Sequence, residues 1–323
     1  ITFICILKAC CSLEACGKGQ EIHVEVMRKG IERDITIANS LVHMYAECGS
    51  LLEAQEMLEG ISVRSATSWR GLISGYVKHG HNHKALDSLE QMQLEGLYPD
   101  AVTYVCCLKA CGNVGAIEKG LAIHAEVARQ GLVERDNVIG NCIISMYSKC
   151  GAHRKAQEVF DGILLHNIVL WTALISAYAQ HAHDEEALIC FGIMQEDGVY
   201  PDAVTFLSLL HACSHSGLVN EAEMCFIDMN KRYGLLPDLD HFTCMVDLFG
   251  RAGHIEKAIG IIQEMPYYDH PPVWIALLGS CRSRGDVTVG RLAFDQSIQI
   301  YSTCAAAYLL MREIYIAAGM PKA

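Results

Sequence analysis

Two short segments contain the residue types of a zinc-dependent nucleobase deaminase. Residues 23–25 (HVE) and 124–126 (HAE) match His-x-Glu, in which the histidine would bind zinc and the glutamate would transfer protons. That chemistry also needs Pro-Cys-x-x-Cys for the remaining zinc ligands, and no Cys-x-x-Cys occurs in the sequence. Gly-x-Ser-x-Gly, His-Glu-x-x-His and a P-loop are missing as well. The sequence therefore predicts no catalytic site, no metal site and no cofactor.

The sixteen cysteines could indicate disulfides or metal binding, but several recur at one place in a repeating pattern. Cys10, Cys111 and Cys213 each follow an alanine in equivalent segments. A free cysteine at a repeated apolar position behaves as a small hydrophobic residue. We therefore predict buried packing thiols and a reducing compartment.

The elements that carry these residues are predicted to be paired helices. In residues 171–202, WTALISAYAQHAHDEEALICFGIMQEDGVYPD, apolar residues recur at i, i+3, i+4 and i+7 in two stretches. Asp184 is expected to cap the second helix, and Gly198 is expected to end it before Pro201. Two such helices cannot bury both apolar stripes against each other, so the pair requires neighbours of the same kind.

The neighbours recur with a long period. A separation of 102 residues joins Trp69 to Trp171 and also Asn39 to Asn141. Units that begin at residues 66, 101, 137 and 168 have lengths of 35, 36 and 31 residues. After residue 266 the pattern changes to helical pairs with a different signature. The chain is thus an array of helical units of three alternating lengths.

Composition agrees with a folded array. Hydrophobic residues are 51% and charged residues 19% of the 323, and no apolar run is long enough to cross a membrane, so we expect a soluble, elongated domain. The chain opens on an isoleucine within a repeat, without a transit segment, so we expect a fragment of a longer protein. A net charge of −12 argues against loose, charge-driven nucleic-acid binding but leaves specific binding open.

The units resemble those of plant pentatricopeptide repeat proteins in which P, L and S repeats alternate. WTALISAY (171–178) is similar to the start of P repeats, TFLSLLHAC (205–213) to that of L repeats, and NCIISMYSKCG (141–151) to that of S repeats. Residues 241–266 resemble the last S repeat. The resemblance implies an all-α, right-handed α-solenoid, with L, S and P repeats over residues 1–270 and E1 and truncated E2 motifs over residues 271–323.

In that family the fifth residue of a repeat's first helix and the last residue of the repeat read one RNA base by hydrogen bonding. By resemblance, the pairs are Asn39 with Ser65, Arg70 with Asp100, Asn141 with Asn167, and Thr172 with Asp202. Val138 and Val169, at the second position, would pack against bases. Helix capping is the alternative role for Asn39 and Asn141. The base read by the Arg70 repeat stays open.

Two further sets of repeat positions are predicted to act as spacers or to contact RNA phosphates. The L units carry Val105 and Leu207 at the fifth position, where an apolar side chain cannot hydrogen-bond to a base, so we expect them to act as spacers. Lys78, Lys149 and Arg251 occupy the thirteenth position, where a cation could contact RNA phosphates. An ordinary solvated surface is the alternative for these three.

The resemblance implies a sequence-specific, single-stranded RNA-binding protein of mitochondria or chloroplasts. It would be the specificity module for C-to-U RNA editing, working with editing-complex proteins or a deaminase in trans, and without a membrane. The family's pairing rules imply the RNA core 5′-Y-N-N-Y-G-3′. Two alternatives remain: a protein-binding helical scaffold, and a factor that stabilises or processes transcripts without editing them.

Overall fold

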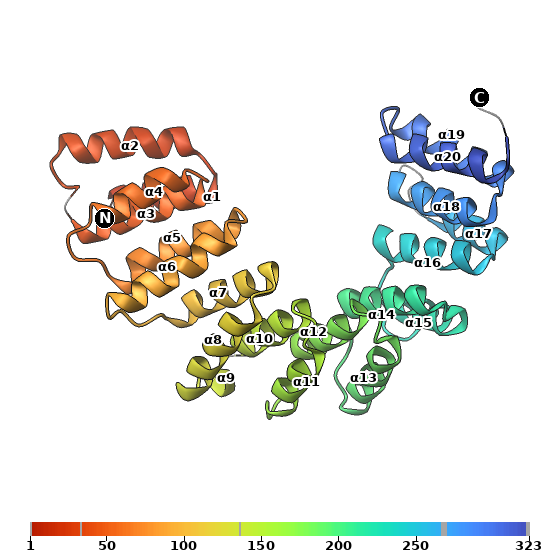
Figure 1. Ribbon diagram of the computed structural model, residues 1–323, viewed down its shortest axis with the longest axis horizontal. Coiled ribbons are helices and arrows are strands. Elements are labelled where there is room, and N and C mark those ends of the chain that lie inside the picture. Colours follow the sequence, from red (N-terminus) through yellow and green to blue (C-terminus); the bar gives the residue numbers. More distant parts are fainter. Residues whose placement is uncertain (1, 33, 136, 266–269, 321–323) are drawn as a thin grey trace. The chain divides into compact units, whose positions relative to one another are not determined.

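The computed structural model describes residues 2–32, 34–135, 137–265 and 270–320, and every regular element in these residues is a helix (Figure 1). The chain divides into two units, Ile1–Leu165 and His166–Ala323, which we describe one at a time.

Unit 1 consists of helix pairs in which a first helix is followed by an antiparallel second helix. Its helices are α1 (Thr2–Ser12), α2 (Cys16–Arg28), α3 (Ile35–Glu47), α4 (Leu51–Glu59), α5 (Ala66–Lys78), α6 (Asn82–Leu94), α7 (Ala101–Val114), α8 (Ile117–Arg129), the short α9 (Leu132–Arg135), α10 (Asn137–Lys149) and α11 (His153–Asp161). The first helices α1, α3, α5, α7 and α10 contact one another in that order.

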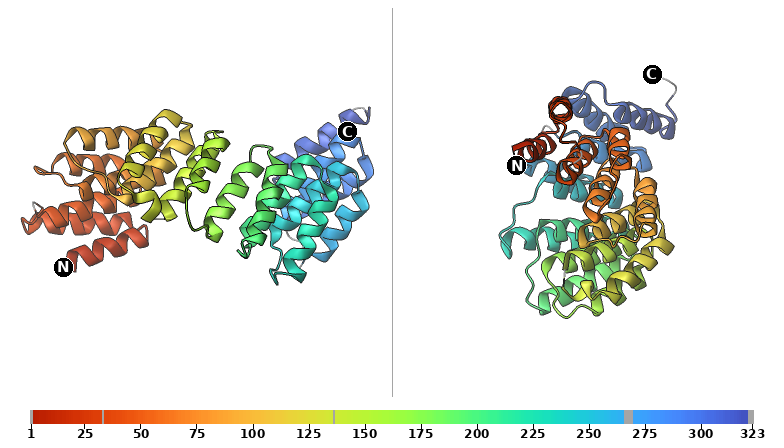
Figure 2. Two further views of the ribbon diagram at one scale, coloured as in Figure 1. Left: turned by 90° about the horizontal axis from the view of Figure 1, so that it is seen from below. Right: turned by 90° about the vertical axis from the view of Figure 1, so that its left-hand side faces the viewer.

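Unit 2 repeats this construction. Its helices are α12 (Ile168–Ala179), α13 (Asp184–Glu196), α14 (Ala203–Ser216), α15 (Val219–Lys231), α16 (Leu239–Ala252), α17 (Ile255–Glu264), α18 (Pro271–Arg284), α19 (Val287–Ile300) and α20 (Ala305–Ala317). Here α12, α14, α16, α18 and α20 contact one another in sequence, and Figure 2 shows the pairs of unit 2 side by side. Each unit is therefore a stretch of helical-repeat fold.

The first helices begin where the sequence predicts. The predicted unit starts at residues 66, 101, 137 and 168 are the first residues of α5, α7, α10 and α12. At α3, α5, α7, α12, α14 and α16, a side-chain oxygen of the preceding residue accepts a hydrogen bond from a backbone N–H of the first turn. These N-cap residues are Asp34, Ser65, Asp100, Asn167, Asp202 and Asp238. The last residue of one repeat is thus the N-cap of the next.

One capping prediction is wrong. Asp184 is the first residue of α13 rather than its cap, because the N-cap residue is His183, whose side chain makes no capping hydrogen bond. The Asp184 carboxylate instead accepts a hydrogen bond from Ser216 of the neighbouring α14. The predicted end of α13 is confirmed, since Gly198 has a φ of +71°, in the left-handed region that glycine tolerates.

The core lies between first helices and between the members of each pair. The fourth residue of several first helices is a buried aromatic side chain: Trp69, Tyr104, Trp171, Phe206 and Phe242. Cys10, Cys111 and Cys213 are buried, which confirms their predicted packing role. Burial raises the pKa of Cys111 to about 11, so this thiol stays protonated and unreactive at neutral pH.

Within the described part of the chain, none of the helices combines the length and apolar character needed to span a bilayer.

Candidate nucleic-acid interface

A groove of about 440 Å³ lies over the first helices of unit 1. Its wall contains Asn39 and Arg70, the fifth residues of α3 and α5, and Thr36 and Thr67, the second residues of the same helices. The remaining lining residues are Ile4, Lys8, Cys11, Ser40, His43, Gly71, Ser74 and Val102. Two predicted base-reading residues from successive repeats therefore share one concave face.

Asn39 is joined to its predicted partner through a third residue. The hydroxyl of Ser68 donates to Asn39 Oδ1 at 2.7 Å, and Ser68 Oγ also lies 3.0 Å from Ser65 Oγ. Asn39 lies inside α3, whose cap is Asp34, so the capping alternative for Asn39 is wrong. The structure gives Asn39 a half-buried position with its side chain held by the next repeat.

Arg70 and Asp100 form a direct ion pair, with Nη1 donating to Oδ2 at 2.8 Å. The other carboxylate oxygen accepts from the backbone N–H of Thr103 at 2.9 Å and from its hydroxyl at 2.7 Å. Partial burial pushes the pKa of Asp100 upward, but these hydrogen bonds and the Arg70 charge outweigh it and hold the pKa below its usual value. Both oxygens of Asp100 are therefore already occupied.

Thr172 and Asp202 of unit 2 are also connected through one residue. Thr172 Oγ1 lies 2.7 Å from Thr205 Oγ1, and the Thr205 hydroxyl donates to Asp202 Oδ1 at 2.8 Å. The backbone N–H of Thr205 donates to the same carboxylate oxygen at 2.8 Å. Thr172 is only 9% exposed, so the hydroxyl chain that holds it is shielded from bulk water.

The connecting residues Ser68, Thr103 and Thr205 were not singled out from the sequence. Each is the third residue of a first helix and follows an N-cap residue by three positions. The sequence did contain a signal for them: a hydroxyl residue three places after Ser or Asp is typical of a reciprocal capping arrangement. That spacing does not show that the hydroxyl also contacts the preceding repeat.

Asn141 and Asn167 lie in different units, and each is described within its own. Asn141 is the fifth residue of α10, so it does not cap that helix either, and its Oδ1 is buried without a hydrogen-bond partner among the described residues. Asn167 caps α12 by accepting from the Leu170 backbone N–H at 3.0 Å. Burial of the Asn141 Oδ1 acceptor without a partner costs free energy, and a hydrogen bond from a bound donor would offset that cost.

The second-position residues present apolar surface to solvent. Val138 and Val169 are 58% and 51% exposed, although both belong to helices with long buried faces. Val102 and Val204, at the same position in the L units, are exposed as well and were not among the predicted residues. Exposed valines at one repeated position provide flat surfaces on which bases could pack.

The three predicted phosphate-contacting cations differ in their surroundings. Lys78 donates to Glu14 Oε1 at 3.0 Å and to Glu47 Oε2 at 3.2 Å, and these bonds raise its pKa above the ordinary value. Lys149 donates to the neutral Asn113 Oδ1 at 2.9 Å. Of these two, Lys149 therefore keeps more of its positive charge uncompensated.

Arg251, the third predicted cation, is held by its own helix and by the preceding repeat. It pairs with Asp247 at 2.8 Å and donates to the Ser214 carbonyl at 2.6 Å.

The histidines of the two His-x-Glu segments contact tyrosine hydroxyls. His23 Nδ1 lies 2.9 Å from the hydroxyl of Tyr45, and His124 Nδ1 lies 2.8 Å from that of Tyr147. Burial lowers the pKa of both imidazoles, assisted at His124 by Lys155. The described residues contain no group of three or more His, Cys, Asp and Glu side chains that could hold a metal ion.

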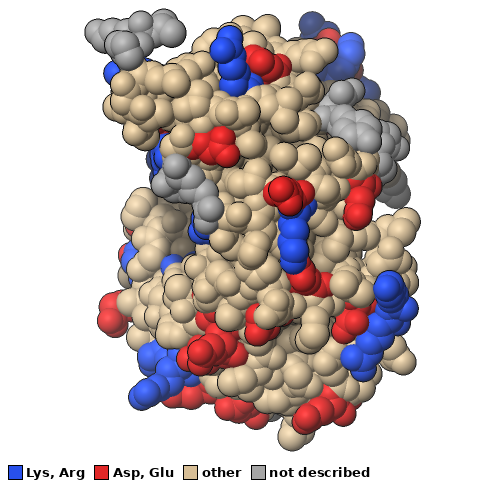
Figure 3. Space-filling model, turned by 90° about the vertical axis from the view of Figure 1, so that its right-hand side faces the viewer, with Lys and Arg blue, Asp and Glu red and all other residues tan. Residues whose placement is uncertain are grey.

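Charged side chains of both signs are interspersed on the face shown in Figure 3, and the described residues there form no broad area of one sign. On this face a polyanion would therefore meet charges of both signs rather than a broad positive field.

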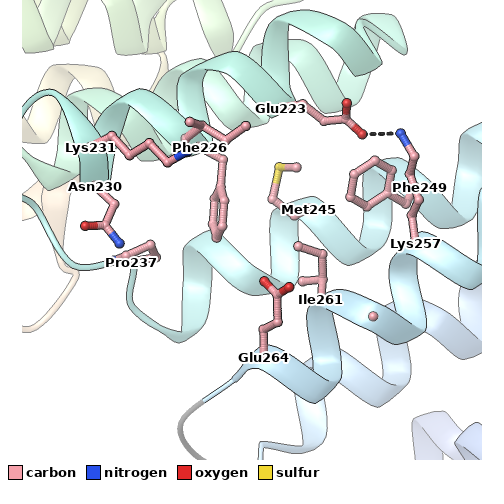
Figure 4. A pocket seen from close by; sticks show the side chains of 12 residues that line it. Glu223, Phe226, Asn230, Lys231, Pro237, Met245, Phe249, Lys257, Ile261 and Glu264 are labelled. Atoms are coloured by element: carbon pink, nitrogen blue, oxygen red, sulfur yellow. Dashed lines mark hydrogen bonds and ion pairs between the residues drawn. The ribbon is translucent and has the colours of Figure 1, made fainter.

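A second groove, of about 500 Å³, lies in unit 2 between α15, α16 and α17 (Figure 4). Phe226, Met245 and Phe249 supply apolar lining, and an ion pair between Lys257 and Glu223 closes one side. None of the fifth-position residues borders it. This groove is thus chemically unlike the groove of unit 1, and it is better suited to an apolar side chain than to a base edge.

The fold and the recurring hydrogen-bonded pairs define a helical-repeat protein in which several repeats present a polar pair at the same two positions. A model described as "PPR repeat family" matches residues 64–113 and 166–215, and one described as "PPR repeat" matches residues 141–168, 204–233 and 240–269. The chain therefore belongs to the pentatricopeptide repeat family.

Relatives in Arabidopsis thaliana agree with this assignment. The chloroplastic pentatricopeptide repeat-containing protein CRR2 is 37% identical, with 99% of this chain and 49% of the relative covered. A putative mitochondrial pentatricopeptide repeat-containing protein is 34% identical, with 98% and 50% covered. The chain thus spans about half the length of the curated relatives that it matches.

Solved structures show the same fold. The pentatricopeptide repeat protein PPR10 from maize superposes with a TM-score of 0.72 at 20% identity, covering 93% of this chain and 44% of that one. PPR10 in complex with an 18-nt psaJ RNA element gives a TM-score of 0.73 at 19% identity, covering 93% and 48%. The predicted all-α solenoid fold is confirmed.

Proposed function

We propose that this chain binds single-stranded RNA in a sequence-specific manner and acts as the specificity module for C-to-U editing of an organellar transcript. The observation that carries RNA binding is the groove of unit 1, which brings the polar fifth residues Asn39 and Arg70 onto one face with the second-position residues. Stacking surfaces combined with polar groups are what recognition of unpaired bases requires.

The editing role rests on the alternation of L, S and P repeats and on the different signature of residues 271–323, which contain α18 to α20. We assign residues 1–270 to the repeat array and residues 271–323 to E1 and truncated E2 motifs. Deamination would then come from an editing-complex partner in trans or from another part of a longer protein. Because matched relatives are named chloroplastic or mitochondrial, we place the protein in one of these organelles.

The rival function is a protein-binding scaffold, which the apolar groove between α15 and α17 favours. The polar pairs favour RNA, because a protein partner would not need polar pairs that recur at the same two positions of several repeats.

A binding titration decides between them. Two RNAs carry the core 5′-Y-N-N-Y-G-3′ and differ only in the final base, G or A, which we assign to Thr172 and Asp202. One lost base-edge contact costs about 1–3 kcal/mol, so the chain should bind the A version about tenfold or more weakly. Asp202→Asn should shift the preference towards A, because one carboxylate oxygen becomes an amide donor.

Asp238→Asn is the matched control. It makes the same chemical change at the cap of α16, the last residue of the unit whose fifth residue is the apolar Leu207. It should leave the ratio of the two affinities unchanged. Equal affinity for the G and A versions in both the wild type and Asp202→Asn would contradict the proposed function.

A further inference from the structure

We propose that the third residue of the following first helix is a positioning residue whose hydroxyl fixes the direction of the hydrogen bonds within a base-reading pair, and so which donors or acceptors of that pair face a base. Ser68 and Thr205 are the two residues to which the structure assigns this role. The inference rests on the proposed RNA binding and concerns how each base is chosen.

In the unit 2 pair, counting hydrogens fixes the direction of every bond. A threonine hydroxyl has one hydrogen and two lone pairs. The hydrogen of Thr205 is given to Asp202 Oδ1, so Thr172 must supply the hydrogen in its 2.7 Å contact with Thr205. Thr172 can then offer a ligand only lone pairs. Asp202 Oδ2, which receives no hydrogen bond from the described residues, is an acceptor as well.

A site with acceptors only distinguishes guanine from adenine. The Watson–Crick edge of guanine carries two adjacent donors, N1–H and the N2 amino group. Adenine has an acceptor at N1, which would face a lone pair. The unit 2 pair therefore selects guanine through its proton arrangement, and Thr205 maintains that arrangement without touching the base.

In the unit 1 pair the same position produces the opposite polarity. Ser68 gives its hydrogen to Asn39 Oδ1, so Ser65 must be the donor in its 3.0 Å contact with Ser68. The Asn39 amide nitrogen has no acceptor among the described residues and presents two hydrogens. A donor of this kind fits the carbonyl and ring-nitrogen acceptors on the Watson–Crick edge of cytosine, or the carbonyl acceptors of uracil.

In the Arg70 repeat the two residues of the pair bond directly to each other. Thr103 bonds Asp100 as Thr205 bonds Asp202, but Arg70 occupies the second carboxylate oxygen. In this repeat both carboxylate oxygens of Asp100 therefore already accept hydrogen bonds within the protein. Arg70→Thr would give it the same three residue types as the guanine-selecting set of unit 2.

The first test measures the ratio of affinities for the RNAs ending in G and in A. Thr205→Val removes the hydroxyl but keeps the backbone N–H that caps with Asp202. Thr172 can then turn its hydrogen outward, and we expect a G-over-A preference of about tenfold to shrink to near unity. Thr205→Ser keeps the hydroxyl and should restore the preference. A Thr205→Val protein that keeps the wild-type ratio would overturn the proposal.

The second test is a gain of specificity in unit 1, which does not depend on how well Thr205→Val folds. Arg70→Thr should create a preference of about tenfold for G over A at the second base of the core. The preference should persist when Thr103→Ser is added and vanish when Thr103→Val is added. The proposal would also be overturned if the double variant Arg70→Thr, Thr103→Val preferred G over A as strongly as Arg70→Thr alone.

Failure of the proposed function gives a different pattern. A wild-type chain with no G-over-A preference at the fifth base would refute base reading itself, and the positioning role with it. A wild-type preference that is indifferent to the third-position hydroxyls refutes only the positioning role.

Discussion

The close approach of α5 to α3 predicts that Gly75→Ala will destabilise unit 1. A Cβ added at Gly75 of α5 would lie 2.5 Å from the Cβ of Ala46 in α3 and 2.7 Å from its carbonyl oxygen. Ordinary carbon contacts are about 3.5–4.0 Å, and no side-chain rotation can move these atoms. The two helices must therefore separate by about 1 Å.

The size of the effect follows from two opposing contributions. Overpacking of this kind costs about 1–3 kcal/mol, and we expect the upper part of that range because the obstructing atoms belong to the backbone and a Cβ. Alanine in place of glycine inside a helix returns about 1 kcal/mol. The net loss in the free energy of unfolding should be about 1–2 kcal/mol.

Gly192→Ala in α13 is the matched control, because a Cβ there meets no atom within 4 Å. It should stabilise unit 2 by about 0.5–1 kcal/mol. Urea unfolding followed by circular dichroism measures both variants. If Gly75→Ala proves at least as stable as the wild type while Gly192→Ala shows its gain, the close packing of α3 on α5 is wrong.

Three further predictions concern protonation, phosphate contacts and metal. The pKa of His124 is lowered by burial and by Lys155, so its contribution to stability is present above pH 6.5 and lost as the pH falls below it. His124→Gln should therefore weaken the drop in unfolding free energy between about pH 7 and pH 5, and an unchanged drop would contradict this. Lys149→Ala should reduce the slope of log affinity against log salt concentration by about 0.7, and Lys78→Ala by less, because Glu14 and Glu47 already compensate Lys78; equal reductions would count against the phosphate assignment. Metal analysis of the purified chain should find no stoichiometric zinc and an activity assay no cytidine deamination, whereas one tightly bound zinc per chain would show that a ligand set was missed.

Periodicity predicted the helices because the signal is local. The starts of α5, α7, α10 and α12 follow from apolar spacing and from the residue before each helix, and Ser65 shows how one side chain marks such a boundary. Asp184 shows the limit of this reasoning: its type and place suit a cap, but a partner 32 residues away, Ser216, takes its carboxylate. The resemblance predicted the same base-reading role for Asn39 and Thr172, since both are fifth residues of first helices.

The interactions between repeats could not be read from the sequence in the same way. The contact of Ser68 with Asn39 spans 29 residues, and that of Lys78 with Glu14 spans 64. Whether such side chains meet depends on the rotation and spacing of stacked helices, which the pattern within one helix does not determine. Ion pairing of Lys78 and closure of Arg70 on Asp100 therefore appear only in the three-dimensional structure.

The central claim is that the first helices read successive bases of single-stranded RNA, and selection from a randomised RNA pool tests it most directly. The chain is incubated with the pool at moderate salt, and the retained RNAs are sequenced. The account predicts enrichment of 5′-Y-N-N-Y-G-3′ in unpaired segments, with the final G lost from the consensus in Asp202→Asn. Retained RNAs without any shared sequence, or the same consensus from Asp202→Asn as from the wild type, would contradict it.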